Sequence, residues 1–181
     1  MPELVRPALP FMASFVEALK EGHNRDTLRP ETPETIAAVD ADHAAFIASL
    51  FVTPDSITLP DGSQGKAVPQ TLLWWVEEDR FLGSLGIRHS LNETLAVVGG
   101  HVGYAMRPSE RGKGHATALL AAGLDHIRQN LPLRRVLLTV NAQNPASIRV
   151  IEKNGGVHTD SVPHLWHPGE TALHYWIDIP A

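Results

Sequence analysis

The feature that most constrains the fold of this chain is residues 106–117, where two glycines separate a strand-like run from a helical pattern. Gly112 and Gly114 allow the backbone to adopt positive φ and to approach a ligand closely. The first N–H groups of the following helix have no partners inside the helix, and its dipole favours an anion there. Successive amides of such a turn can also form an anion-binding nest. The segment therefore predicts a loop that holds a diphosphate; the alternative is an ordinary glycine turn with two solvated basic residues.

The charge near this loop differs from the charge of the whole chain. Between residues 107 and 114, Arg107, Arg111 and Lys113 stand against Glu110, a local balance of 3 − 1 = +2. The complete chain has a formal net charge of −5 and a pI near 6.0. The overall charge therefore gives no reason to expect nucleic acid or an anionic membrane as a partner.

Several other kinds of site are excluded by sequence. The loop is not a Walker motif, and Thr117 stands where a G-x-G-x-x-G motif has its third glycine. The chain has no cysteine, which rules out disulfides, thiolate metal ligands and a cysteine nucleophile. Of its ten histidines, only His164 and His167 form a close pair, and no H-E-x-x-H pattern accompanies them. We therefore expect no metal site.

The apolar periodicity predicts one α/β domain over residues 1–181, with the element order β-α-α-β-β-β-α-β-α-β-β. We expect a mixed central sheet of about seven strands flanked by helices. Residues 53–70 carry three prolines and two glycines and are expected to form a long loop, either a substrate-side flap or a tolerated insertion. Helices are expected at 10–19, 32–50, 116–127 and 145–154, and strands at 4–6, 71–77, 81–89, 96–106, 135–140, 157–162 and 172–179.

The size and composition agree with this expectation. A chain of 181 residues with 43% hydrophobic residues can bury the core of one domain. No apolar run reaches the length of about 18 residues that a membrane span needs. The first residues lack the pattern of a signal peptide, so a cytoplasmic protein is expected.

Two motifs in order carry a resemblance to a known family. Residues 111–116 resemble the R/Q-x-x-G-x-G/A signature of the GNAT superfamily of acyl-CoA-dependent N-acyltransferases, and residues 104–108 resemble the strand end before it. Residues 140–155 resemble the second motif of that family, in which an asparagine precedes a short helix. The segments RH-x-LN and GGH-x-GY, ahead of the loop, resemble a little-characterised branch. The likeness covers residues 95–156, and the element order extends it.

The resemblance implies acetyl-CoA as cosubstrate and a binding site for it. Two neighbouring strands are expected to splay apart, so that the pantetheine arm pairs with the first of them and the Met106 amide faces the thioester carbonyl. The loop amides would hold the pyrophosphate, and Asn144 would bond the pantetheine arm, although helix capping explains this residue equally well. The cofactor-binding residues implied are Tyr104, Ala105, Met106, Arg111, Gly112, Lys113, Gly114, His115, Ala116, Thr117, Asn141, Asn144 and Ser147.

The sequence points to the catalytic residues less specifically than to the cofactor-binding residues. His101 and His89 suit the role of a base because histidine titrates near neutrality. Strand alternation places His101 opposite to Tyr104, however, and a structural histidine is the alternative for both. At the position of Ile151, many GNAT members have a tyrosine that acts as the acid for the leaving thiolate. This chain departs from that pattern.

Two functions remain open at this stage. One is an N-acetyltransferase that acts on a primary amine of a small molecule or protein, as a monomer or homodimer. The other is a non-catalytic acyl-CoA-binding or sensor domain.

Overall fold

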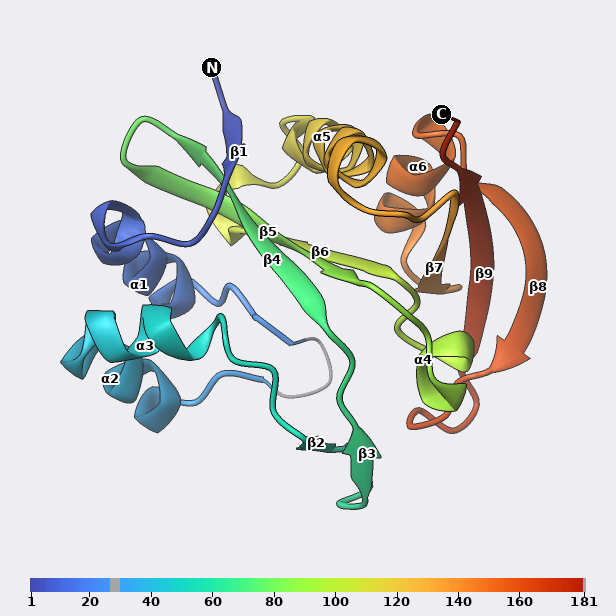
Figure 1. The fold of residues 1–181 in the computed structure, drawn as a ribbon, viewed down its shortest axis with the longest axis horizontal. Helices are drawn as coiled ribbons and strands as arrows, with labels where there is room; N and C mark the ends of the chain where they lie inside the picture. The colour runs from blue at the N-terminus through green and yellow to red at the C-terminus, as the bar shows by residue number, and fades with distance from the viewer. Residues whose placement is uncertain (27–29, 181) are drawn as a thin grey trace.

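The computed structural model describes residues 1–26 and 30–180, which alternate between strands and helices (Figure 1). The N-terminal part has β1 (Glu3–Val5), the 3-10 helix η1 (Leu9–Phe11), α1 (Met12–Lys20), α2 (Pro33–Ala41) and α3 (His43–Ser49). The middle has β2 (Ser56–Thr58), β3 (Gln64–Lys66), β4 (Gln70–Glu77), β5 (Arg80–Arg88), α4 (Glu93–Val97) and β6 (Val102–Met106). The rest has η2 (Pro108–Glu110), α5 (His115–Asn130), β7 (Arg135–Asn141), α6 (Pro145–Lys153), β8 (Val157–Pro163) and β9 (Thr171–Asp178).

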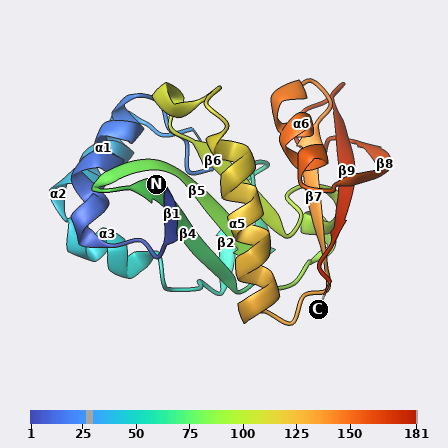
Figure 2. The same ribbon diagram turned by 90° about the horizontal axis from the view of Figure 1, so that it is seen from above.

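Apart from the β2–β3 hairpin, the described strands form two sheets rather than one. The first has the order β1-β4-β5-β6 and the second the order β7-β9-β8, and every pair in them is antiparallel. The single mixed sheet expected from the sequence is therefore divided between β6 and β7. In Figures 1 and 2, α1, α2 and α3 lie on one side of the first sheet, and α5 lies on the other side.

Strand alternation divides the apolar residues into two cores. Leu73 and Trp75 of β4 belong to the core that α5 and the second sheet share, whereas Trp74 and Val76 belong to the core under α1. Both faces of β4 are thus buried, which explains its nearly continuous apolar sequence. Phe15 of α1 stacks on Trp74 with ring centroids 4.6 Å apart. The first sheet is consequently packed on both faces, and β6 is the edge strand on the side of the second sheet.

Three local predictions were wrong. The helix expected at 32–50 is two helices, because the Asp42 side chain caps α3 by accepting the Ala45 N–H. The loop expected at 53–70 contains the β2–β3 hairpin. The strand expected at 96–106 begins only at Val102, because Asn92 caps the short helix α4 in front of it.

Candidate functional site

β6 and β7 meet at one point and then separate. The His101 N–H donates to the Leu137 carbonyl over 2.7 Å, and the Leu137 N–H donates to His101 Nδ1 over 2.9 Å. Beyond this contact the two strands belong to different sheets. A cavity of about 870 Å³ opens between them and extends toward the N-terminal helices. Its walls at the strands are Val102, Gly103, Tyr104 and Ala105 of β6 and Leu138, Thr139, Val140 and Asn141 of β7.

The edge of β6 that faces this opening carries backbone groups that β5 does not bond; of these, the Met106 carbonyl accepts from Arg111 Nε over 3.4 Å. The Arg107 N–H donates to the Leu82 carbonyl over 2.9 Å, which marks this pair as a hydrogen-bonded pair of the β5–β6 ladder. Because such pairs alternate in antiparallel sheets, Tyr104 and Met106 direct their N–H and C=O groups away from β5. The edge therefore presents backbone donors and acceptors with which an extended ligand can pair as a further strand would.

The glycine loop after β6 has the geometry of an anion site. Gly112 and Gly114 have φ of +75° and +87°, and Gly114 is the N-cap of α5. Within the described residues, the backbone N–H groups of 112–116 donate to no protein acceptor. These free donors lie at a helix N-terminus, where the dipole adds to their attraction for an anion. A cluster of this kind is complementary to a phosphate or diphosphate.

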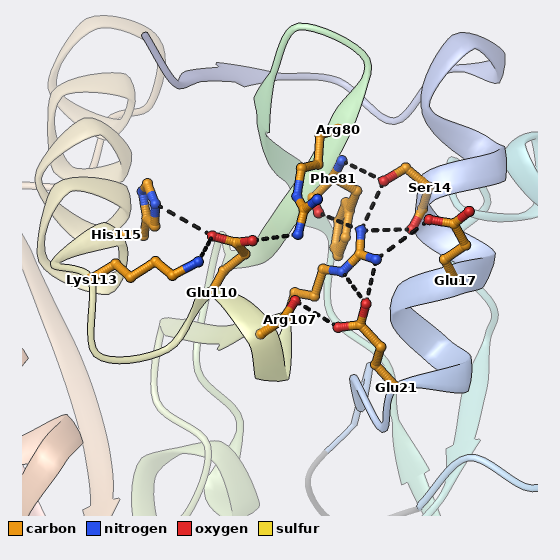
Figure 3. Close-up of polar contacts among 10 residues, drawn as sticks. Ser14, Glu17, Glu21, Arg80, Phe81, Arg107, Glu110, Lys113 and His115 are labelled. Atoms are coloured by element: carbon orange, nitrogen blue, oxygen red, sulfur yellow. Dashed lines mark hydrogen bonds and ion pairs between the residues drawn. The ribbon is translucent and has the colours of Figure 1, made fainter.

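Two sets of ion pairs hold this loop against α1 and β5 (Figure 3). Arg107 is 3% exposed, and its guanidinium bonds the Glu21 carboxylate and, over 2.9 Å, the Ser14 hydroxyl. Ser109 donates to the other Glu21 oxygen over 2.7 Å. The hydrogen bond from Arg107 is the main cause that lowers the pKa of Glu21 to about 2. Arg107 therefore ties the loop to α1, and it does not add free positive charge as the local balance of +2 implied.

Glu110 is the centre of the second set. It is 6% exposed and accepts from Arg80 over 2.5 Å and from Lys113 over 3.0 Å, and His115 lies 3.7 Å away (Figure 3). Burial alone would raise its pKa, but the bonds from Lys113 and Arg80 hold the pKa below its usual value. Arg80 of β5 and Lys113 of the loop thus hold the loop in shape through Glu110. The backbone amides of the loop take no part in these ion pairs.

The second motif contributes the opposite wall of the cavity. The Asn144 side chain accepts the Ser147 N–H over 3.1 Å and so caps α6. The Tyr104 hydroxyl reaches across the opening and donates to Ser147 Oγ over 3.1 Å. Asn141 donates to the Glu170 carboxylate. The structure thus brings Tyr104, Ala105, Asn141, Asn144 and Ser147 to one cavity. Met106 and residues 111–117 are outside its lining and follow it along the chain.

The two histidines proposed as bases have structural contacts. His101 is 7% exposed, and its Nδ1 lone pair is occupied by the Leu137 N–H. Burial, together with the nearby Arg88, lowers the pKa of His101. His89 Nε2 lies 2.8 Å from Thr71 Oγ1. Neither imidazole is among the described residues that line the cavity. Their contacts support a role in the fold rather than in proton transfer.

The cavity also contains polar residues that the sequence analysis did not single out. Ser84, Asn24 and Arg88 also line it, and Arg88 Nη1 bonds the carbonyls of Gly99 and Gly100. No motif marked Asn24 or Ser84, whereas Arg88 stands in the RH-x-LN segment. In residues 1–26 and 30–180, no three metal-ligating side chains gather, and no helix is long and apolar enough to cross a membrane.

Comparisons with known proteins agree with this geometry. The family model described as the acetyltransferase (GNAT) domain matches residues 37–157. An uncharacterized Bacillus subtilis protein, YkkB, is 29% identical over 147 residues, which cover 71% of this chain and 83% of that protein.

Solved structures show the same fold. A spermidine N-acetyltransferase from Vibrio cholerae, in complex with CoA and spermine, superposes with a TM-score of 0.62 at 13% identity, over 98% of this chain and 95% of that one. RimL, a ribosomal L7/L12 alpha-N-protein acetyltransferase in complex with coenzyme A, gives 0.63 at 13% identity, over 98% and 94%. The chain therefore belongs to the GNAT family of acetyltransferases, with acetyl-CoA as its cosubstrate.

Proposed function

We propose that this protein transfers the acetyl group of acetyl-CoA to a primary amine of a small molecule or protein, by direct attack in a ternary complex. The observation that carries the proposal is two sets of backbone groups: the free N–H groups of residues 112–116, and the edge of β6 at Tyr104 and Met106 that no strand covers. The two sets follow each other along the chain. One is suited to a diphosphate, and the other to an extended amide-containing arm.

The residues present fit acetyl-CoA. The amides of residues 112–116 would hold the pyrophosphate, with Arg111 beside them. The edge groups of Tyr104 and Met106 would pair with the pantetheine amides, and the Met106 N–H would donate to the thioester carbonyl. Asn144 and Ser147 stand on the facing wall. Catalysis would then rest on holding the amine near the thioester and on stabilising negative charge at its oxygen.

The acceptor would enter from the side of the N-terminal helices and the β2–β3 hairpin, whose residues line the same cavity. In the described part of the lining, cations outnumber carboxylates: Arg25, Lys66 and Arg88 stand against Asp26 and Glu31. Arg25 bonds Glu31, with one contact of 2.8 Å, and Asp26 lies near enough to Arg88 to counteract the lowering of its pKa by burial. This shortage of carboxylates favours an acceptor with one cationic amine over a polyamine, because several ammonium groups require several carboxylates.

The alternative of a non-catalytic acyl-CoA-binding domain is supported by Ile151. This residue is 2% exposed and places an aliphatic side chain where the resemblance leads one to expect a tyrosine. Binding of acetyl-CoA without turnover would then be the function.

Release of free thiol from acetyl-CoA separates the two functions. We expect release to depend on an added amine, with amino acids, monoamines, peptide N-termini and spermidine tested side by side. The Gly114→Glu variant is the control, because it should lose release with every amine. Binding of acetyl-CoA with no amine-dependent release across the panel would establish the non-catalytic alternative instead.

A further inference from the structure

A thiolate that leaves acetyl-CoA needs a proton, and under the proposed function it leaves inside the opening between β6 and β7. We propose that the phenol of Tyr104 supplies that proton. The amine nitrogen bonds to the carbonyl carbon and loses a proton to water, the C–S bond breaks, and sulfur takes the electron pair of that bond. The Tyr104 O–H proton then passes to sulfur, which gives the neutral thiol and a phenolate that regains a proton from water. This inference rests on the proposed function and deepens it.

The position of Tyr104 carries the argument. Its backbone lies in the middle of β6, in a pair with Leu85 that leaves its N–H and C=O directed at the opening. Its side chain crosses the opening to the first turn of α6, with the hydroxyl 3.1 Å from Ser147 Oγ and 3.4 Å from the Ser147 carbonyl. An extended ligand paired with this strand edge would pass directly beside the phenol.

The described parts of β6, β7 and α6 that form the opening offer no second acid. Among the described residues of β6, β7 and α6 that line the cavity, Tyr104 alone has a side chain that ionises in water; the others are Val102, Gly103, Ala105, Leu138, Thr139, Val140, Asn141, Asn144, Ser147 and Ile151. His164 and His167 line the cavity from the β8–β9 connection, where His164 Nδ1 accepts the Trp166 N–H. Tyr104 is therefore the donor that the strand edge itself provides.

The surroundings suit a donor that becomes briefly anionic. Burial raises the pKa of Tyr104, and the bond to Ser147 lowers it only in part, so the phenol is protonated at neutral pH. Ser147 stands in the first turn of α6, where the helix dipole favours negative charge. Its hydroxyl can rotate from accepting the phenol proton to donating to the phenolate.

Two variants test the role. Tyr104→Phe should lower kcat about 10²-fold or more, the usual range for loss of a positioned acid, while KM for acetyl-CoA stays within about threefold. Tyr175→Phe is the matched control, because it removes the same hydroxyl from the other tyrosine, which lies outside the cavity lining and donates to Glu152 over 3.3 Å, and it should retain most of kcat. If the two variants behave alike, with kcat preserved and only stability or KM changed, Tyr104 is a structural latch and the inference is overturned.

A second measurement reports on the phenol itself. The chain has two tyrosines, so Tyr175→Phe leaves Tyr104 as the only site at which a fluorinated tyrosine is incorporated. Fluorination lowers the pKa of the phenol, and an acid must be protonated to act. The alkaline limb of the kcat profile should therefore move to lower pH in the labelled protein, and an unmoved limb contradicts the proposal. Absence of amine-dependent release by the unmodified protein would instead refute the proposed function, and this role with it.

Discussion

Substitution of Gly114 by glutamate separates the binding role of the loop from its role in the fold. Gly114 has φ of +87°, and a Cβ built there meets no atom within 4 Å. The cost to the free protein is therefore the left-handed conformation of a non-glycine residue, about 1–2 kcal/mol. For a domain of this size, that lowers the thermal midpoint by about 2–8 °C. The carboxylate at the α5 N-terminus recovers part of this cost.

The effect on acetyl-CoA should be much larger. A carboxylate about 4–5 Å from one phosphate charge is repelled by about 3–4 kcal/mol at an effective dielectric constant of 20. Affinity should consequently fall by about 10²- to 10³-fold. Equilibrium dialysis measures this loss, and circular dichroism checks the fold.

Gly62→Glu is the matched control for this experiment. Gly62 has φ of +84° and equally open surroundings, but it lies in the β2–β3 turn. It should share the strain and keep the affinity. Wild-type affinity in a folded Gly114→Glu protein, or an equal loss in Gly62→Glu, would refute the assignment of the loop.

Three further predictions concern the surroundings of the site. Burial lowers the pKa of His23 from 6.5 to about 4, so the folded state resists its protonation. Stability should therefore fall by about 3 kcal/mol between pH 7 and pH 4, and urea titrations should show this dependence reduced in His23→Leu. Glu21→Ala should cost about 2–3 kcal/mol in urea unfolding, since it leaves buried Arg107 without its main partner, while exposed Glu17→Ala should cost almost nothing. His101→Ala should lower the free energy of unfolding by about 2 kcal/mol and leave turnover per folded molecule unchanged. A loss of turnover by about 10²-fold would instead identify His101 as the general base.

Local chemistry made part of the site predictable. The two glycines, the run of β-strand residues before them and the amphipathic helix after them are adjacent in sequence, so the loop could be placed from residue types alone. The same is true of Asn144, because an asparagine before proline at a helix start is a capping signal.

Long-range contacts set the limit of that prediction. Arg107 was counted as free charge because its partner Glu21 lies 86 residues away. The contact of His101 with Leu137 depends on two strands meeting, which no local pattern encodes. A strand was expected to begin at Ala96 and to run to Met106. The Asn92 cap and the positive φ of Gly99 and Gly100 decided in favour of a short helix and a turn.

Calorimetric titration of the protein with acetyl-CoA tests the central claim most directly. The free amides of residues 112–116 and the open edge of β6 predict binding of one acetyl-CoA per chain. The thermal midpoint should rise with ligand, because stability increases by about 2.7 kcal/mol at a concentration of 100 times Kd. The absence of both heat and thermal shift at millimolar acetyl-CoA would contradict the account.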